Sequence, residues 1–437
     1  MGWDSMHNQE VPTASRLIIP ALTVVAVVAI LFAKSPAMFL DPRFFGEEAT
    51  MLFPKFLYQS PIASLFNLYL GYLLFLTNIS VLLSTKVSLE HAPAVTTYIA
   101  LMVQIVVAYQ LGAFIREYRL GLIAAVLLVV GFSLQWGSYE IALSATELQW
   151  VLGISVFLVL VMPSEWAKKH ALLCSVWLLF CGVSGVPAGI LAPSFLLRFW
   201  DTRERVLLYF CGILGACALL QLSLVLSAGA PGRSFYSGLS LLLFPPLLQT
   251  LIEPIVGPET VFLIGTYIQG ALPRVGMLGL GTIIIAIGLA AAIIFSAWDA
   301  KRERLVLVLV ATWFYVSLVQ TLVALQQPTL MTAAGARYFL IGVMSVLTLC
   351  ALGSVNADKS KRIFATGILA VIAAAGLSQF VAGTWNTYFT TGPSWSSQVR
   401  ECAGQQTCTI QLWPNDGITY LKIDNGHVVS SLYPVQL

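Results

Sequence analysis

The sequence predicts an all-α polytopic membrane protein with about 11 transmembrane helices, outer juxtamembrane helices and a small β-containing C-terminal tail. Only 10% of the 437 residues are charged, against roughly 25% in soluble domains. Hydrophobic residues make up 58% of the chain, and the mean hydropathy is +0.86. Apolar runs without charges recur at about the length that crosses a bilayer. So few charges could not cover the surfaces of soluble domains, and a net charge of +3 does not indicate a nucleic-acid partner.

Eleven apolar runs are the candidate spans. Seven runs are long and clear: 17–33, 93–115, 206–228, 276–298, 305–326, 338–355 and 363–382. Four runs are shorter or weaker: 120–134, 148–162, 171–184 and 186–197. The first run is long, and no small-x-small cleavage site follows it at once, so we do not interpret it as a cleavable signal peptide.

The distribution of Lys and Arg sets the orientation, because these residues collect in short cytoplasmic loops. The stretch 171–197 is either one long span or a hairpin broken at Ser184-Gly185-Val186-Pro187. With a hairpin and a cytoplasmic N-terminus, 14 of the 23 Lys and Arg are cytoplasmic. They are Arg16, Arg116, Arg119, Lys168, Lys169, Arg198, Arg203, Arg205, Lys301, Arg302, Arg304, Lys359, Lys361 and Arg362. A single span would place the Lys and Arg at 198–205, 301–304 and 359–362 on the outer face, so the hairpin is favoured.

Most of the chain outside the spans then lies on the outer face. We divide the protein into a membrane module, 1–382, with outer loops at 34–92 and 229–275, and a small cap, 383–437. The apolar stretch 62–84 is interpreted as juxtamembrane helices, because counting it as a span would invert every later loop.

The cysteines agree with this orientation. Five of the seven lie in predicted spans, where a buried Cys acts as a small hydrophobe. Cys402 and Cys408 lie in the polar tail on the outer side, where disulfides persist, and we predict that they are bonded. Two free thiols are the alternative. Alternating residues in 409–413 and 419–423 predict strands in the same tail.

The first outer loop holds the most informative charges. Asp41, Arg43, Glu47 and Glu48 lie within eight residues, among aromatic side chains and just beyond the first span. A carboxylate at a partly apolar interface can act as a general base. The alternative is a solvated loop in an interfacial aromatic belt. The predicted spans contain no ionisable side chain except Cys and Tyr, which weighs against an ion- or proton-coupled transporter.

The acidic pair, within Arg43-Phe44-Phe45-Gly46-Glu47-Glu48, resembles the modified Asp-x-Asp motif of the GT-C superfamily of integral-membrane glycosyltransferases. That motif lies in the first extracytoplasmic loop of those enzymes. Other short features resemble bacterial members of the superfamily with unassigned acceptors. These features are Gly71-Tyr72, Leu89-Glu90-His91-Ala92-Pro93, Leu148-Gln149-Trp150, Ser184-Gly185-Val186-Pro187 followed by Arg198, and Gly335-Ala336-Arg337-Tyr338. The resemblance covers most of the chain as topology.

The resemblance implies an inverting transfer of a sugar from a polyprenyl (undecaprenyl) phosphate carrier to an acceptor outside the cytoplasm. One carboxylate removes the proton of the acceptor hydroxyl while the phosphate leaves. By position this role falls to Glu47, with Glu48 and Asp41 as alternatives. Asp41 precedes Pro42 and could instead cap the following turn.

A leaving phosphate calls for cations, and Arg binds phosphate in a bidentate manner. Arg337, beside Tyr338 at the outer mouth of a predicted span, is the first candidate. An Arg that merely extends to the interface is the alternative. Arg274 and Arg233 flank the large outer loop. Arg43 is a further candidate, or else the ion-pair partner of Glu47.

Glu253 and His91 are candidates for contacts with the acceptor or the sugar. A solvated charge is the alternative for Glu253, and a structural role is the alternative for His91. The resemblance favours neither a metal nor another cofactor, since the metal-dependent branch uses pyrophosphate donors. If a divalent ion were needed, the acids of the first outer loop could bind it.

We therefore expect a glycosyltransferase of a bacterial inner membrane, with a cytoplasmic N-terminus and a periplasmic C-terminus. Its partners would be a polyprenyl-phosphate-linked sugar, a glycan or lipid-linked acceptor such as an O-antigen-like surface glycan, and the bilayer. Two alternatives remain at this point. A flippase or transporter of lipid-linked glycans predicts polar residues inside the spans or repeat symmetry. A non-catalytic membrane scaffold gives the acidic pair no special role.

Overall fold

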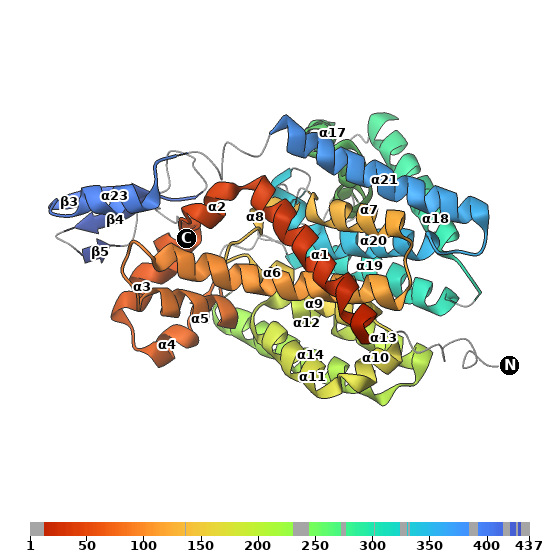
Figure 1. The fold of residues 1–437 in the computed structure, drawn as a ribbon, viewed down its shortest axis with the longest axis horizontal. Helices are drawn as coiled ribbons and strands as arrows, with labels where there is room; N and C mark the ends of the chain where they lie inside the picture. Colours follow the sequence, from red (N-terminus) through yellow and green to blue (C-terminus); the bar gives the residue numbers. More distant parts are fainter. Residues whose placement is uncertain are drawn as a thin grey trace.

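A computed structural model of the chain describes residues 13–135, 137–229, 244–271, 277–300, 302–323, 330, 333–383, 392–413, 420–424 and 427–429. The described chain is a bundle of helices with a small β-sheet at one end of its long axis (Figure 1). We call this the tail end of the bundle, because the C-terminal tail forms the sheet.

Among the described residues, six helical segments are long and apolar enough to cross a membrane. They are α1 (Thr13–Lys34), α6 (Ala92–Glu117), α14 (Arg205–Ser227), α19 (Glu303–Val323), α20 (Leu340–Gly353) with the turn before it, and α21 (Lys359–Ala382). Shorter apolar helices are α5 (Phe75–Ser84), α7 (Leu122–Ser133), α9 (Leu148–Val161), α11 (Ala171–Val183) and α18 (Met277–Ala297). This architecture is compatible with the predicted all-α membrane class, whereas the count of about 11 spans stays a prediction.

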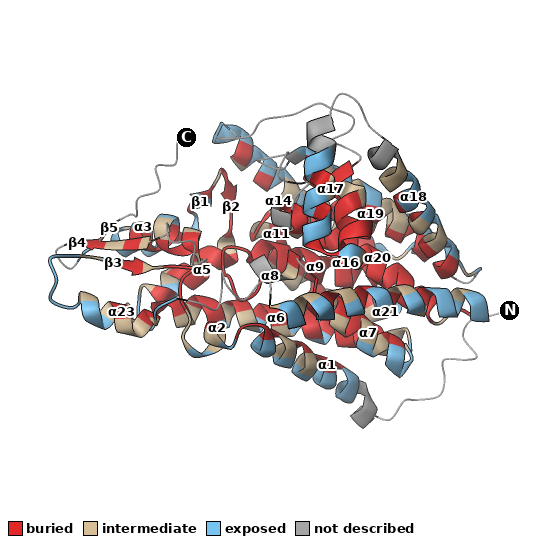
Figure 2. Ribbon diagram, turned by 90° about the horizontal axis from the view of Figure 1, so that it is seen from above, coloured by how far each residue is buried: buried red, intermediate tan, exposed pale blue. Residues whose placement is uncertain are grey.

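Two helices form the centre of the bundle. Every residue of α9 and α20 is buried (Figure 2). The outer helices expose large apolar side chains instead, such as Leu172 on α11 at 80% and Val381 on α21 at 76%. A helix that is apolar all round is either buried or in contact with lipid. The apolar outer surface therefore fits a protein embedded in a membrane.

The helix after residue 171 breaks at the position that the sequence predicts. Helix α11 ends at Val183, and α12 (Val186–Ile190) and α13 (Ala192–Thr202) follow. Gly185 has φ +148°, and a Cβ there would lie 2.5 Å from Cβ of Gln149. Only glycine meets both conditions, since it tolerates this backbone and has no side chain to clash. The break brings α12 into contact with the central helix α9.

The loop between α1 and α6, which we call the first loop (residues 34–92), contains short elements. They are α2 (Pro36–Leu40), the π-helix η2 (Glu48–Leu52), α3 (Phe53–Tyr58), α4 (Pro61–Leu65), strands β1 (Leu68–Tyr69) and β2 (Tyr72–Leu73), and α5. The sequence suggested that the stretch 62–84 is helical throughout, but the structure places strands β1 and β2 within it. Leu70 (φ 49°) and Gly71 (φ 86°) make a two-residue turn that pairs Tyr69 with Tyr72. Two positive φ angles are typical of the tight hairpin turns that match strand twist.

The tail folds as helix α23 (Trp395–Cys402) and a sheet of β3 (Thr407–Gln411), β4 (Tyr420–Asp424) and β5 (His427–Val429) in the antiparallel order β3-β4-β5. A disulfide between Cys402 and Cys408 joins α23 to β3. Ile410 and Leu421 of the sheet pack in one core with Phe44, Phe53 and other residues of the first loop. The tail and the first loop therefore stabilise each other.

The remaining described elements connect the long helices. They are α8 (Gly137–Glu140), α10 (Ser164–Lys169), the π-helix η3 (Leu248–Ile252), α16 (Glu253–Val256), α17 (Pro258–Ala271) and the 3-10 helix η5 (Ala333–Phe339). Of these, α8 and η5 matter most for the site. A Cβ on Gly137 would lie 2.9 Å from the backbone of Ala336, so glycine allows the two segments to touch.

Candidate active site

The acidic pair lies where the first loop meets the tail. The backbone N–H of Trp413 donates to the carbonyl oxygen of Phe44 at 3.0 Å, and Phe45 and Trp413 form a short parallel bridge. Phe44 is fully buried, with its ring edge-on to that of Trp395 at 5.5 Å. These contacts fix the backbone just before Glu47, which caps η2.

Glu48 points into the protein and holds a second loop. Its Oε1 accepts the backbone N–H groups of Ala145 at 2.6 Å and Thr146 at 3.2 Å, and the hydroxyl of Ser144 at 3.3 Å. Burial raises the pKa of Glu48 to about 7, while the N–H donors act in the opposite direction. The carboxylate therefore anchors the segment before α9, which we call the α8–α9 loop (residues 141–147).

Charged groups from two other segments act on the carboxyl group of Glu47. Burial raises the pKa of its carboxyl group, the negative charge of Glu147 raises it further, and the positive charge of Arg337 lowers it. Glu147 is the last residue of the α8–α9 loop, and Arg337 lies on η5. Segments far apart in the sequence thus place two carboxylates and one guanidinium in one site.

The guanidinium of Arg337 contacts Glu147 and Tyr338. Its Nη1 lies 3.5 Å from Oε1 of Glu147, which is buried. Its guanidinium lies over the ring of Tyr338, 5.5 Å from the centroid, and that ring is edge-on to Trp150 at 4.9 Å. A guanidinium is a strong ligand for an anion, and the Arg337 side chain is still 27% exposed.

Two tyrosines of the β1–β2 hairpin border the same site. Tyr69 and Tyr72 are edge-on at 5.9 Å, and Nε2 of Gln149 donates to the hydroxyl of Tyr72 at 3.3 Å. Burial raises the pKa of Tyr69, and the charges of Glu47 and Glu147 add to the shift. The Tyr69 phenol therefore shares the electrostatic environment of the acids.

Short sequence features from several parts of the chain meet here. Gly71-Tyr72 forms the hairpin, Leu148-Gln149-Trp150 opens α9, Gly185 closes on Gln149, and Gly335-Ala336-Arg337-Tyr338 forms η5. None of these features lies near another in the sequence. Their convergence around Glu47 is a property of the fold.

Asp41 lies on the tail side of the first loop. Its Oδ2 accepts the backbone N–H of Trp395 at 3.1 Å, and its Oδ1 accepts the hydroxyl of Ser394 at 3.3 Å. These two donors begin helix α23, so the carboxylate caps that helix. Arg43 is buried, and its guanidinium lies over the ring of Trp413 at 4.9 Å. Both residues contact the tail.

The other candidates lie in different surroundings. His91 is exposed just before α6, and its Nδ1 lies 2.8 Å from the hydroxyl of Ser88. Glu253 is buried at the start of α16, and burial raises its pKa to about 8. Arg233 and Arg274 lie outside the described residues. In the described part of the chain, no group of three or more His, Cys, Asp or Glu is arranged to hold a metal ion.

Sequence reasoning missed Glu147, Tyr69 and the role of Tyr72. Glu147 could have been noticed as an acid directly before Leu148-Gln149-Trp150, at the mouth of a predicted span. Tyr69 carries no such signal, because its place in the site depends on the hairpin.

Comparison of the chain with protein-family models, with curated proteins and with solved structures gave no match. The geometry of this site is therefore the basis for the function.

Proposed function

We propose that the protein is an integral-membrane glycosyltransferase that uses a polyprenyl-phosphate-linked sugar. The observation that carries the proposal is the grouping of Glu47, Glu147 and Arg337 in a partly buried site at one end of an apolar bundle. A displacement at a glycosyl phosphate requires a base and a phosphate-binding cation in the same site.

Glu47 is the proposed base. It is only half-buried, and within the described residues no other side chain donates a hydrogen bond to its carboxylate. Its raised pKa makes the carboxylate a stronger proton acceptor than an ordinary Glu. Glu48, by contrast, already accepts two backbone N–H groups and a hydroxyl.

Arg337 is the proposed ligand of the donor phosphate. A phosphate beside it would carry negative charge throughout the reaction and more as the sugar bond breaks. Glu147 orients the guanidinium through the 3.5 Å contact. Glu48 acts one step further away, because it anchors the loop that ends at Glu147.

The reaction balances with these groups. The acceptor hydroxyl oxygen forms a bond to the anomeric carbon, and its proton passes to the Glu47 carboxylate. The bond between that carbon and the phosphate oxygen breaks, and its electron pair leaves on the polyprenyl phosphate beside Arg337. Direct displacement inverts the anomeric centre. Tyr69 and Tyr72 offer aromatic and hydroxyl contacts for a sugar ring next to the acids.

The proposal includes the arrangement in the membrane. The tail end of the bundle would face the periplasm of a bacterial inner membrane, and the N-terminus the cytoplasm. The eleven predicted spans would carry the polyprenyl chain alongside them. The site is at the same end as the tail and would therefore open to the periplasm. The proposed acceptor is a glycan or a lipid-linked glycan on that side.

Transfer of sugar by the full chain in lipid nanodiscs tests the proposal. The donors are a panel of synthetic polyprenyl-phosphate monosaccharides, and an extract of cell-envelope glycans supplies the acceptor. We expect release of polyprenyl phosphate with one donor, and loss of that release with Glu47→Gln. Binding of donors without turnover of any of them would refute the proposal.

A matched control tests whether the loss of any carboxylate at this end of the molecule has the same effect. Glu401 is exposed on α23, at the same end of the molecule. Glu401→Gln should therefore transfer sugar at the rate of the unmodified protein. Equal loss in both variants would show that Glu47 has no special role.

A further inference from the structure

The β1–β2 hairpin is held on its outer edge by a glutamine from a long apolar helix. Nε2 of Gln221, on α14, donates to the Leu73 carbonyl oxygen at 2.9 Å, and its Oε1 accepts the Leu73 N–H at 2.9 Å. Gln221 is 2% exposed, so both bonds are made away from water. Breaking either bond would leave a buried polar group unpaired, which is costly, and the pair therefore favours one fixed geometry.

These two bonds make the Gln221 amide a substitute for a third strand. Tyr69 is opposite Tyr72, and Leu68 is opposite Leu73. In an antiparallel ladder, opposite residues alternate between pairs that bond to each other and pairs that do not. The backbone groups of Leu73 bond to Gln221, so they point away from β1, and the amide lies where the next strand would lie. It thereby stabilises a two-stranded ribbon that would be marginal on its own.

Close packing of two helices places this amide. Helix α14 lies against α11, where a Cβ on Gly182 would be 2.7 Å from Cβ of Cys217. Cys217 is four residues before Gln221 and so on the same face of α14. Nε2 of Gln221 also lies 3.4 Å from the Gly182 carbonyl oxygen, and the hydroxyl of Ser184, just after α11, accepts the N–H of Leu76 at 3.2 Å. Helices α11 and α14 together therefore hold the segment that follows the hairpin turn.

The tyrosines of the hairpin lie near the acids of the site. Burial raises the pKa of the Tyr69 phenol, and the charges of Glu47 and Glu147 raise it further. Across the ribbon, the hydroxyl of Tyr72 accepts Nε2 of Gln149 at 3.3 Å. Tyr72 is therefore held at its hydroxyl by α9, while the next residue of the strand is held by α14. A shift of the ribbon would move both rings relative to Glu47.

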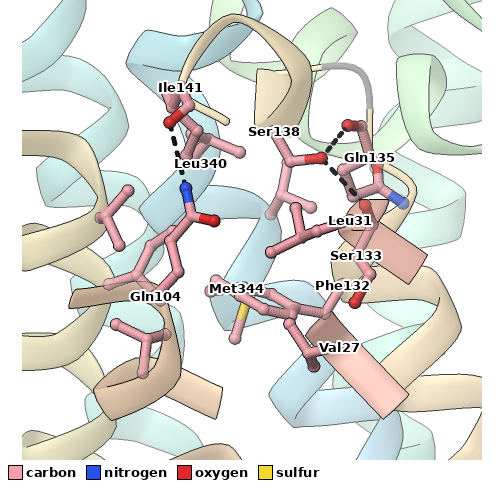
Figure 3. A pocket seen from close by; sticks show the side chains of 14 residues that line it. Val27, Leu31, Gln104, Phe132, Ser133, Gln135, Ser138, Ile141, Leu340 and Met344 are labelled. Atoms are coloured by element: carbon pink, nitrogen blue, oxygen red, sulfur yellow. Dashed lines mark hydrogen bonds between the residues drawn. The ribbon is translucent and has the colours of Figure 1, made fainter. Parts of the chain in front are cut away.

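Other buried glutamines of the bundle make a different kind of bond. Gln104 lines the space between α1, α6, α7, α9 and α20, and its Nε2 donates to the Ile141 carbonyl oxygen at 3.2 Å (Figure 3). Gln110, on α6, accepts the hydroxyl of Ser155 at 2.7 Å. Each of these bonds uses one end of the amide, whereas Gln221 bonds with both ends to one residue of a strand. The Gln221 amide is thus suited to orient a backbone segment.

We infer that Gln221 is a positioning residue of the site: by pairing with Leu73 it holds the two hairpin tyrosines near Glu47. Its effect on sugar transfer rests on the proposed function, whereas its effect on the hairpin does not. A change confined to the hairpin should disturb the contacts of the sugar and leave the phosphate site at Arg337 in place.

Hydrogen–deuterium exchange of the full chain in nanodiscs tests the hold on the hairpin. Gln221→Leu removes both bonds, and we expect amides in 68–76 to exchange about tenfold faster, as the loss of a buried hydrogen bond implies. Gln110→Leu is the matched control, because it removes a buried amide elsewhere in the bundle, and should leave exchange in 68–76 unchanged. Unchanged exchange in Gln221→Leu, or equal acceleration in the control, would overturn the inference.

A conservative variant separates the two bonds from general damage to the fold. A protonated carboxyl group has the same donor and acceptor as an amide. In a buried site it stays protonated at about pH 6, since burial disfavours the charged form. Gln221→Glu should therefore keep the exchange rate of the unmodified protein at that pH. Equal loss of protection in Gln221→Glu and Gln221→Leu would overturn the inference.

Steady-state transfer then separates the sugar from the phosphate. We expect kcat/KM of Gln221→Leu to fall about tenfold, while inhibition by sugar-free polyprenyl phosphate stays unchanged. Normal transfer in this variant, or a parallel loss of inhibition, would overturn the inference and leave the proposed function standing. If the unmodified protein transfers no sugar, the proposed function fails, and the exchange in 68–76 alone decides whether Gln221 holds the hairpin.

Discussion

Two π-helical segments of the molecule have the same local design but hold their acids differently. In η2, Thr50-Met51-Leu52-Phe53-Pro54 leads into α3, and in η3, Thr250-Leu251-Ile252-Glu253-Pro254 leads into α16. In both, the proline lacks an N–H, and its ring would clash with the carbonyl group four residues earlier. A widened π turn relieves that clash.

The acids of the two segments have different surroundings. Glu48, at the start of η2, accepts two N–H groups and a hydroxyl. Glu253 comes directly after η3, and no described residue donates a hydrogen bond to its carboxyl group. Burial raises both pKa values, to about 7 for Glu48 and to about 8 for Glu253.

The comparison teaches that burial alone does not make a functional acid. The η2 segment is bonded to the α8–α9 loop, and the charges of Glu147 and Arg337 act on its neighbour Glu47. The η3 segment also contacts η5, yet the pKa shift of Glu253 has burial as its only cause. We therefore place the chemistry at η2 and a structural role at η3.

The largest expected difference between the segments is in activity. Glu47→Gln should lower kcat/KM for sugar transfer by about 10²–10⁴-fold, the range for loss of a general base. Glu253→Gln should change kcat/KM by less than about threefold, because the neutral acid and the amide have the same charge and shape. Steady-state transfer assays on both variants measure this. A large loss of kcat/KM in Glu253→Gln would indicate that Glu253, next to η3, takes part in the reaction.

Arg337 should give the next largest effect. Arg337→Ala removes a charge-assisted phosphate contact, and we expect the donor KM to rise about 10–100-fold, since such contacts contribute about 1.5–3 kcal/mol. Arg400 is exposed on α23, so Arg400→Ala is the control and should leave KM unchanged. Donor titrations at fixed acceptor measure KM. An unchanged KM in Arg337→Ala would show that Arg337 does not bind the donor phosphate.

Much of this fold was predictable because the signals are local. Apolar runs mark α1, α6 and α21, Gly185 marks the break after α11, and alternation marks β3 and β4. Each of these depends on a few neighbouring residues. The β1–β2 hairpin was not predicted, because Leu70 at positive φ replaces the Asn or Asp that usually indicates such a turn.

The site was predictable only in part, because it closes through long-range contacts. The acidic pair and Arg337 could be singled out by residue type and position. Glu147 precedes Leu148-Gln149-Trp150 in the sequence, but its closeness to Glu47 was not predictable, since it follows from the bond between Ala145 and Glu48, which are 97 residues apart. The hydrogen bonds that the tail donates to Asp41 and Phe44 likewise join residues far apart in the sequence.

The disulfide should matter for η2 and not for η3. Cys402→Ser with Cys408→Ser frees α23 from β3, and closing so short a loop contributes about 2 kcal/mol in the chain-entropy model. Because the tail packs on the first loop, amide exchange should become faster in 41–53, while 248–256 should keep its rate. Hydrogen–deuterium exchange of the reduced and oxidised protein provides the same comparison without mutation. Equal exchange in 41–53 would show that the tail does not stabilise the acidic pair.

The smallest expected effect is a pH slope that distinguishes the two buried acids. A carboxyl group whose folded pKa is raised binds more protons in the folded than in the unfolded state, so it favours folding at low pH and less as pH rises. For Glu253 this loss should extend from about 4.5 to about 8, and for Glu48 it should end near 7. Each group can contribute up to about 1.4 kcal/mol per pH unit within its window. Thermal unfolding in detergent should therefore show a weaker decrease between pH 7 and 8 in Glu253→Gln, and no change there in Glu48→Gln. Identical slopes in the two variants would mean that the donors around Glu48 do not set it apart from Glu253.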